Sequence, residues 1–423
     1  MTLSNYRCFA DRQTIELRPI TCLFGRNNSG KSALTRSPLV LSTGIHTDST
    51  TPLDLDLLGE DIVDSFLDLI HGRRPHGSIE IGFTVETEQG PVDLTVKVQN
   101  IDEYHIQTVS LFEVTTNDRR LTLTWERNDP SDGAANYSFT GPGLNEHEIL
   151  VRFRGLLPTA IESEKISSTI RDEILELSSR IRENLGTIRY LGPFRDRPAR
   201  FYRMPTRMPD FVGPSGEHTA SILAADLKRN QGGLIEFINQ HFGKSLPDWS
   251  VNAVESSGLY NIVLQSKVDP SVEVNLVDTG TGIAQALPIF VQRALDLYTG
   301  TKKPILEMVE QPELHLHPAA HGTLADLYLN ATLGTNARFL IETHSETFLL
   351  RLRRRVAEGK LAPTSISLYF IENSNGSTVA RRINVDDAGN LDYWPRGVFS
   401  EDYDEAKLLA KAQLSQLSGP NAH

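Results

Sequence analysis

Apolar and polar residues alternate along two stretches of the chain, and a helical spacing follows the second. Residues 1–24 carry β-type apolar side chains in short alternating runs, which predict two or three strands. From about 78 to 140, alternating segments separated by turn residues are typical of an antiparallel meander. Residues of about 145–186 are predicted to be helical up to Gly186, because these apolar residues recur three and four positions apart: Ile166, Ile170, Ile174, Leu177 and Ile181.

The rest of the chain alternates between strands and helices. The pattern predicts a helix from Lys31 to Gly44, a strand in "TIRYLG" and a second helical region at about 216–243. From 259 to about 372 strands and helices alternate again, and the tail predicts a loop and a last helix.

These elements predict an α/β fold in which the two ends of the chain build one mixed-sheet core. We expect four parts: 1–75 as the N-terminal part of that core, 76–142 as an antiparallel β subdomain, 143–258 as an inserted helical subdomain, and 259–423 as the C-terminal part of the core.

Composition narrows the class of protein. The chain has 423 residues, 39% hydrophobic and 23% charged, which is ordinary for a soluble globular protein. No stretch reaches the roughly 18 apolar residues that a membrane helix needs, so no membrane partner is expected. The first residues lack the apolar core of an export signal, and Cys8 and Cys22 are the only cysteines. A reduced, cytoplasmic setting is therefore favoured.

The net charge of −12 argues against a protein coated with nucleic acid, because such binding depends on neutralising phosphates. Local arginine-rich stretches at 152–155, 195–207 and 351–355 keep DNA open as a partner, although a solvated surface is the simpler reading of each.

Residues 22–32 read "CLFGRNNSGKS", a short apolar strand that runs into a loop. Gly25, Gly30, Lys31 and Ser32 fit the pattern G-x-x-x-x-G-K-[ST], with a strand before it and a helix after it. The glycines let backbone N–H groups face phosphate oxygens. Lys31 would neutralise phosphate charge and the Ser32 hydroxyl would hold Mg²⁺, so we expect ATP here. Four further loop residues are expected to contact the nucleotide: Asn27, Asn28, Ser29 and Ala33.

Two more strands are predicted to end in residues that suit such a site. "KKPILEMVEQPELHLHP" predicts a buried strand ending at Glu310, whose carboxylate can reach Mg²⁺. Glu307 lies inside that strand, so its carboxyl needs an arginine partner or a lobe boundary. In "RFLIETHSETFLL" the strand ends at Thr343–His344, from where His344 could contact the γ-phosphate and sense its loss.

Two weaker patterns remain. In "VDTGTGIAQALP", Gly280, Thr281 and Gly282 precede a helix and could bind an anion, or could be a plain capped turn. Glu313 with three histidines of "LHLHPAAH" invites a zinc site, which the loose spacing and the lack of accompanying cysteines disfavour: His315, His317 and His321.

Together these pieces resemble the ABC-type ATPase heads of the SMC/RecF/OLD group, in the order phosphate loop, signature-like "DTGTGIAQALP", acidic strand and switch "ETHSE". The segments "EQPELHLHP", "THSE", "RYLGPFRDRP" and "WPRGVF" are most similar to OLD-like phage-defence ATPases. The opening "LSNYRCF" resembles the entry strand of this group, in which Arg7 would approach the nucleotide.

The resemblance implies a dimer with ATP sandwiched between two copies of the chain. Lys31 and Ser32 of one copy would hold the phosphates and Mg²⁺, while residues 280–282 of the other would close on the γ-phosphate. Glu310 would be the acidic Mg²⁺ partner and His344 the switch.

Three departures from the family pattern change this expectation. Gln311 stands where the family often places the water-polarising glutamate, so hydrolysis is slow, Glu313 takes over, or ATP binding is itself the signal. No Q-loop glutamine can be placed, and "DIVDSFLDLIHG" occupies that region. The residues after His344 do not supply the Toprim pattern of OLD nucleases, so nuclease activity is not expected.

We therefore expect an ATP-hydrolysing switch that dimerises around ATP and signals to a separately encoded effector, such as a nuclease or toxin, in prokaryotic defence against phage. Two alternatives stay open. One is a RecF-like clamp on duplex DNA, in which Arg351, Arg354 and Arg355 share a helical face. The other is a nucleotide-binding scaffold with little turnover.

Overall fold

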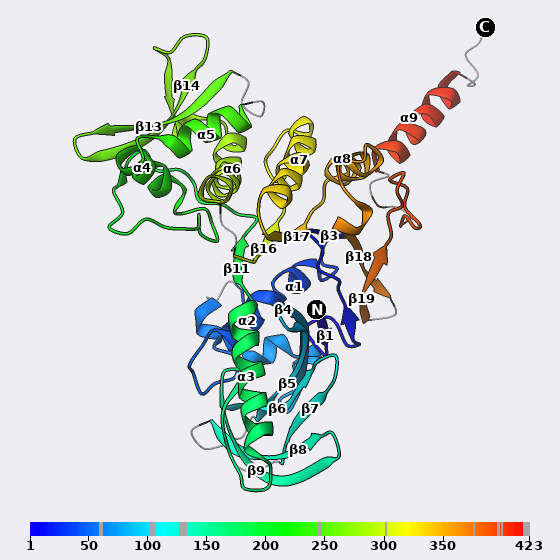
Figure 1. Cartoon of the computed structure of the whole chain (residues 1–423). Helices are drawn as coiled ribbons and strands as arrows, with labels where there is room; N and C mark the ends of the chain where they lie inside the picture. The colour runs from blue at the N-terminus through cyan, green and yellow to red at the C-terminus, as the bar shows by residue number, and fades with distance from the viewer. Residues whose placement is uncertain are drawn as a thin grey trace.

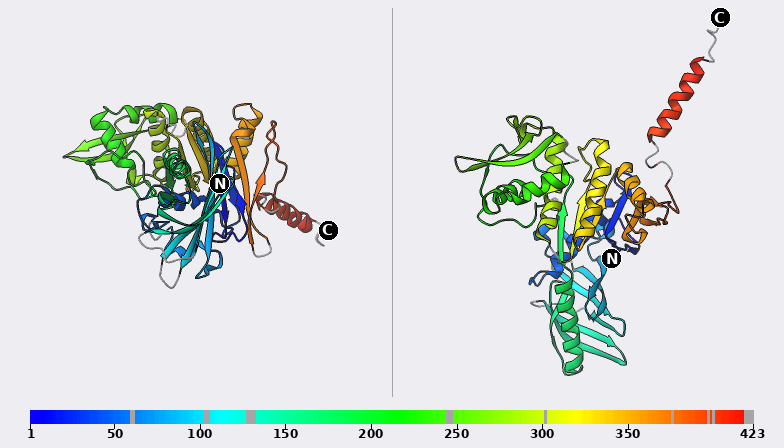
Figure 2. Two further views of the ribbon diagram at one scale, coloured as in Figure 1. Left: turned by 60° about the horizontal axis from the view of Figure 1, so that its bottom comes forward. Right: turned by 45° about the horizontal axis from the view of Figure 1, so that its top comes forward.

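Three β-sheets organise the chain in the computed structural model (Figure 1). The structure describes residues 1–58, 62–101, 106–126, 133–243, 248–300, 303–374, 377–395, 398 and 401–417. A six-stranded central sheet carries a nine-stranded antiparallel sheet on one side and a lobe with a small third sheet on the other, as Figure 2 shows from two further directions. The predicted α/β class, with a mixed-sheet core and an antiparallel β subdomain, is confirmed, but the segment expected to be a helical insert contains β9–β13 as well as α3, α4 and α5.

The central sheet has the order β11-β16-β17-β3-β18-β19, parallel except for the edge strand β19. Every residue of β3 is buried, as expected for a parallel strand covered on both faces. Segments from both ends of the chain join in this sheet, as predicted. Its strands are β3 (Ile20–Gly25), β11 (Thr187–Leu191), β16 (Ile305–Glu310), β17 (Ala337–Glu342), β18 (Ile366–Ser374) and β19 (Ser377–Ile383).

The antiparallel sheet is the predicted meander, but it is longer than predicted. The helix expected from about residue 145 begins only at Ser168, since β9 and β10 extend the sheet to Glu162. Buried residues recur at every second position of "ILVRFR" in β9, which is a strand period. The strands are β1 (Thr2–Ser4), β2 (Gln13–Thr14), β4 (Ser78–Thr87), β5 (Gly90–Ile101), β6 (Ile106–Thr115), β7 (Arg120–Trp125), β8 (Ala134–Gly141), β9 (Leu144–Arg154) and β10 (Leu157–Glu162).

Helices cover these sheets. In Figure 1, α6, α7 and α8 lie side by side along the central sheet, α3 runs along the antiparallel sheet, and α9 points away from the body. The third sheet contains β12 (Tyr202–Arg203), β13 (Trp249–Ser256), β14 (Leu259–Ser266) and β15 (Glu273–Asn275). The helices are α1 (Lys31–Thr35), α2 (Ser37–Ile45), α3 (Ser168–Asn184), α4 (Thr219–Arg229), α5 (Gly233–Phe242), α6 (Thr281–Thr299), α7 (Pro318–Gly334), α8 (Glu346–Ala357) and α9 (Glu401–Leu417).

The single helix predicted from Lys31 to Gly44 is two helices that meet at Arg36. α1 has only five residues, and α2 begins at Ser37 with Pro38 in its first turn. Proline suits the first turn of a helix but cannot donate a backbone hydrogen bond to a preceding turn. Arg36 therefore lies at a break between helices.

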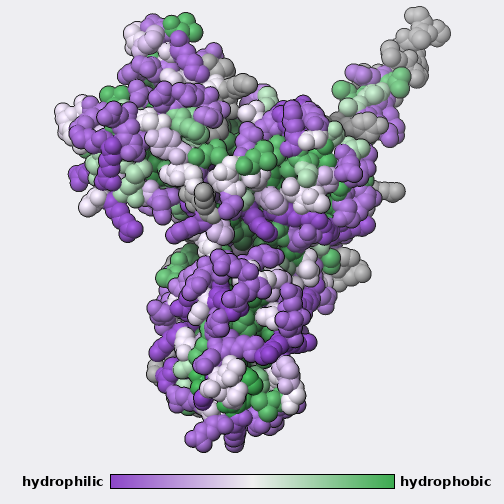
Figure 3. Space-filling model, in the orientation of Figure 1, coloured by the Kyte–Doolittle hydropathy of each residue, from purple (hydrophilic) through white to green (hydrophobic). Residues whose placement is uncertain are grey.

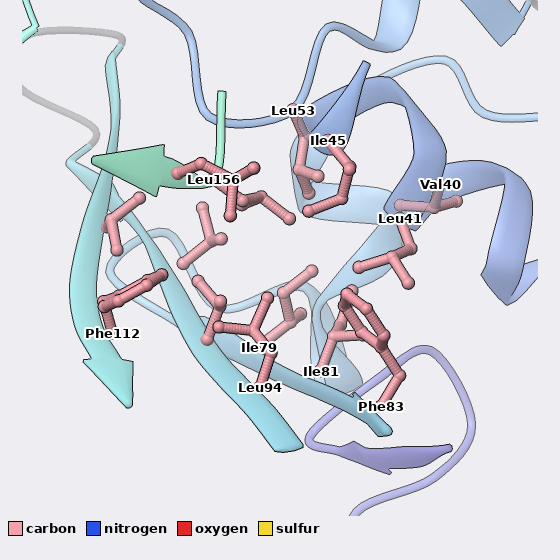
Figure 4. Close-up of a cluster of buried hydrophobic side chains, with 14 of the residues drawn as sticks. Val40, Leu41, Ile45, Leu53, Ile79, Ile81, Phe83, Leu94, Phe112 and Leu156 are labelled. Carbon is pink, nitrogen blue, oxygen red and sulfur yellow. The ribbon is translucent and has the colours of Figure 1, made fainter. Parts of the chain in front are cut away.

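The two faces of the central sheet pack into separate cores. On β3, Leu23 joins the core shared with α2 and the antiparallel sheet, while Cys22 and Phe24 join the core under α6, α7 and α8. Figure 4 shows the first core, where side chains of α2 such as Leu41 face Ile81 and neighbouring residues of β4. Because successive side chains of β3 point to opposite faces of the sheet, the strand before the loop packs into both cores.

The second core contains a buried group of ion pairs. The expected partner for Glu307 is confirmed: the Arg293 guanidinium of α6 donates to its carboxylate, and both side chains are at most 1% exposed. Asp296, one turn further along α6, accepts from Arg189 of β11 at 2.7 Å. Arg293 also stacks over the Phe339 ring of β17, 4.7 Å from its centroid. Helix α6 is therefore tied to three strands of the central sheet.

Replacing Glu307 with alanine is expected to lower the free energy of unfolding by about 3–5 kcal/mol, because the buried Arg293 charge would lose one of its two carboxylate partners and keep only Asp296, 3.2 Å away. Chemical denaturation measures this change. The double change Arg293→Met with Glu307→Leu should cost less, since it removes both buried charges. Arg200→Ala is the control, because its ion pair with Asp278 is exposed. A Glu307→Ala protein as stable as the wild type would contradict the prediction.

Candidate functional site

The loop after β3 folds around two glycines that no larger residue could replace. A Cβ atom added to Gly25 would lie 2.3 Å from the Ile371 carbonyl oxygen of β18. Gly30 has a φ of +98°, and a Cβ atom there would lie 2.4 Å from the Cys8 sulfur. Asn28 also adopts a left-handed conformation, which asparagine tolerates. These positions explain the residue types that the loop pattern requires.

Lys31 lies inside the loop. Its ammonium donates to the carbonyl oxygens of Gly25, at 3.2 Å, and Arg26, at 2.9 Å, and burial lowers its pKa. Asn27 and Asn28 are exposed, whereas Ser29 is buried and its hydroxyl has no hydrogen-bond partner among the described residues. A buried cation and an unpartnered hydroxyl beside exposed amides fit a phosphate group.

Two carboxyl groups meet beside this loop, at the ends of β16 and β17. Glu310 and Glu342 are register partners in the parallel sheet. Arg36 holds Glu310 with two bonds, from Nε to Oε1 at 2.6 Å and from Nη2 to Oε2 at 2.8 Å. The Arg36 guanidinium also lies over the Tyr190 ring, 5.7 Å from its centroid. The expected Mg²⁺ partner Glu310 thus has both oxygens bound to an arginine in this structure.

Glu342 is a site residue that the sequence reasoning missed. Its carboxyl is hydrogen-bonded by the Ser32 hydroxyl and accepts from Thr35 Oγ1 at 3.4 Å. Burial and the charge of Glu310 raise its pKa to about 7. An acid at the end of the apolar run "RFLIE" parallels Glu310 at the end of "ILEMVE", and that parallel could have identified it. The oxygens of Ser32 and Glu342 are of the kind that Mg²⁺ prefers, whereas both oxygens of Glu310 are bound to Arg36.

The predicted switch residue His344 lies next to this group. Burial and the Lys31 charge lower the pKa of His344 to about 4, so its imidazole is neutral at neutral pH. The backbone N–H of His344 donates to Glu313 Oε1 at 2.6 Å, and burial raises the pKa of Glu313. Glu313 therefore secures the switch backbone in this structure. Whether it also serves as a base stays a prediction.

Gln311 and Arg195 are hydrogen-bonded to each other beside the same site. Gln311 has a φ of +44°, and its N–H donates to the Glu342 carbonyl oxygen at 2.8 Å. The buried Arg195 donates from Nη2 to the carbonyl oxygens of both Glu310 and Gln311, at 3.4 Å. Gln285 of α6 brackets the Arg195 backbone with bonds of 3.2 and 2.9 Å. Arg195 belongs to the segment "RYLGPFRDRP", but the sequence pattern did not predict it as a site residue.

The signature-like turn lies at the open start of α6. Gly280 is the N-cap residue, and no side chain caps it. Gly280 and Thr281 are exposed, and an added Cβ atom at Gly280 would meet nothing within 4 Å. At Gly282 such an atom would lie 2.8 Å from the His315 carbonyl oxygen. Within the described residues, no hydrogen bond joins this turn to the phosphate loop.

Arg7 makes its contacts away from the loop. Its Nη2 donates to the Ile62 carbonyl oxygen at 2.6 Å and its N–H to that of Leu69 at 2.7 Å. Ala33 follows Ser32 in α1 and is partly buried. Contact of Arg7 and Ala33 with nucleotide stays a prediction.

The histidines after Glu313 have separate partners. His317 accepts from the Ala319 N–H at the start of α7, and His321 bonds to Ser345 Oγ at 2.8 Å. Among the described residues no three acidic, histidine or cysteine side chains are grouped to hold a metal ion.

The arginine run of α8 is partly neutralised within the chain. Arg351 and Arg355 both donate to Asp326 of α7, and Arg354 pairs with Glu358. These pairs reduce the positive charge available for DNA phosphates, so the structure does not favour the DNA clamp. No helix within the described part of the chain is long and apolar enough to cross a membrane.

Among known protein families, the match covers only a short part of the chain. A family model described as "Protein of unknown function (DUF3696)" matches residues 361–408. No curated protein matches the chain.

Among solved structures, an SMC head bound to the C-winged helix domain of ScpA is 12% identical, with a TM-score of 0.49, over 92% of this chain and 97% of that one. An SMC head domain from Thermotoga maritima is 10% identical, with a TM-score of 0.40, over 91% and 98%. A Pyrococcus furiosus SMC head with an extended coiled coil, bound to the C-terminal domain of ScpA, is 10% identical, with a TM-score of 0.46, over 97% and 98%. We base no functional argument on likenesses this distant.

Proposed function

We propose that this chain is an ABC-type ATPase that binds ATP between two copies of itself and acts as a switch. The observation that carries this proposal is the convergence of Lys31, Ser32, Glu310, Glu342 and His344 at the carboxyl ends of three adjacent strands. Ligands of open parallel sheets bind at this edge, and no catalytic cofactor is needed for phosphoryl transfer beyond a metal ion.

The residues of the chain divide the work of phosphate binding. Lys31 would exchange its two loop carbonyls for phosphate oxygens, and the loop N–H groups and the Ser29 hydroxyl would hold the remaining oxygens. Ser32 with a strand-end carboxylate would hold Mg²⁺, which neutralises charge on the phosphates when bound. His344 is neutral and can donate one hydrogen bond to a terminal phosphate, so its contacts would change when that phosphate leaves.

A second copy is required because one chain does not close its own site. Gly280 and Thr281 of the turn are exposed, and the open space around Gly280 leaves room for a phosphate. Beside it, a groove between α6 and the start of α7 is lined by apolar residues that include Ile283, Phe290 and Leu316. Figure 3 shows hydrophobic residues on the part of the surface over α6 and α7. Such a surface suits contact with another protein chain.

Turnover is expected to be slow. Gln311 can orient a water molecule but cannot accept its proton, and Glu313 is buried with Oε1 already accepting from the His344 N–H. A slow ATPase keeps the ATP-bound dimer long enough for a partner to recognise it. A separately encoded effector, in defence against phage, follows from the motif resemblance alone. Loss of phage resistance in cells carrying Lys31→Ala would support that setting.

Lys31→Ala is expected to weaken ATP binding at least about ten-fold, because a charge-assisted contact worth about 1.5–3 kcal/mol is lost. Anisotropy of a fluorescent ATP analogue measures the affinity. Lys165→Ala is the matched control, since that ammonium is exposed and pairs with Glu148. Equal affinities for the wild type and Lys31→Ala would remove the proposal.

Mixing two inactive variants tests the shared site. Gly280→Glu is expected to fold normally, since nothing surrounds that position, but to repel the γ-phosphate of the other copy. Each of Lys31→Ala and Gly280→Glu should lack phosphate release alone, while their mixture should regain it, because a mixed dimer contains one intact loop facing one intact turn. A mixture as inactive as its components would show that the site is not shared between copies.

Gln311→Glu is expected to raise steady-state phosphate release about ten-fold or more, because positioned bases contribute roughly 10²–10⁴-fold. ATP affinity should change little, and it is measured in parallel. A rate that stays at the wild-type value, with ATP still bound, would mean that proton transfer does not limit turnover.

A further inference from the structure

Glu342 has a different set of partners from the acid beside it. Glu310 and Glu342 end neighbouring parallel strands in register, so their carboxyl groups repel one another when both are charged. The charge of Glu310 is compensated by Arg36, whose guanidinium binds both of its oxygens. Glu342 receives only hydroxyl groups, from Ser32 and Thr35.

Among the residues that the structure describes, no cationic side chain is bonded to Glu342. Its side chain is 3% exposed, so water does little to solvate its charge. Lys31 is near, but its ammonium donates to the carbonyl oxygens of Gly25 and Arg26. Buried carboxylates are paired or coordinate a metal, and the oxygen facing Ser32 is of the kind that Mg²⁺ prefers.

We propose that Glu342, on the switch strand β17, is a Mg²⁺ ligand of the nucleotide site together with Ser32, while Arg36 holds Glu310 away from the metal. This inference rests on the proposed function and deepens it. It also alters the sequence-based expectation, which gave the metal carboxylate to Glu310 alone. A ligand on β17, two residues before His344, would connect metal occupancy directly to the switch.

Mn²⁺ is a suitable probe because its binding is read by electron paramagnetic resonance without any turnover. The full-length chain is titrated with Mn²⁺ in the presence of a non-hydrolysable ATP analogue, and the affinity for the analogue is measured separately in EDTA. Glu342→Gln should weaken Mn²⁺ binding at least ten-fold and leave analogue binding in EDTA unchanged or tighter. Glu310→Gln should change Mn²⁺ binding by less than three-fold. Glu236→Gln, an exposed acid of α5, is the control.

Each outcome decides the matter. A loss of Mn²⁺ binding in both acid variants supports Glu342 as a ligand but overturns the part of the inference that keeps Glu310 away from the metal. A loss in Glu310→Gln with full binding in Glu342→Gln overturns the inference. If Glu342→Gln does not fold, Glu342→Asp replaces it and should weaken Mn²⁺ binding more than Glu310→Asp does. A wild-type chain that binds no analogue in EDTA or Mn²⁺ contradicts the proposed function itself, whereas bound analogue with unaltered Mn²⁺ affinity in Glu342→Gln contradicts only this inference.

Discussion

The structure depends on how it compensates acidic side chains buried in the central parallel sheet. Glu307, Glu310 and Glu342 lie on two adjacent strands that hydrophobic layers cover on both faces. Each would be too costly to bury as an unpaired charge. Arg293 of α6 pairs with the first, and Arg36, at the break between α1 and α2, pairs with the second. The third has hydroxyl partners only, and it lies beside the phosphate loop.

These pairs also decide how the parts of the molecule are connected. Arg36 lies at the break between α1 and α2, one short helix after the loop. Its ion pair with Glu310 therefore ties the loop to the end of β16. Arg293 ties the far part of α6 to the same strand, and Gln285 on α6 brackets Arg195 under Gln311. A displacement of α6 would therefore reach the strand ends of the candidate site through buried, directional contacts.

The glycines of the loop and the need for a partner of Glu307 could be predicted from residue patterns, because both requirements are local. The phosphate loop needs glycine where a Cβ atom would collide, and "GRNNSGKS" states that need directly. An apolar strand with an internal glutamate demands a buried partner, which Arg293 supplies. The prediction of a helix from about residue 145 was wrong for the residues before Ser168. Helical spacing holds only from there, and the preceding residues form the strands β9 and β10.

The sequence by itself determined the residue types of the loop, the strands that end in acids and the histidine after β17, because steric and solvation requirements act within a few residues. Only the tertiary structure decided that Arg36 takes Glu310, that Glu342 meets Ser32, and that Arg195 supports Gln311. Those partners are separated by more than a hundred residues in the chain, and the register of parallel strands brings them together. Charge pairing in a buried site depends on that register, which no local pattern encodes.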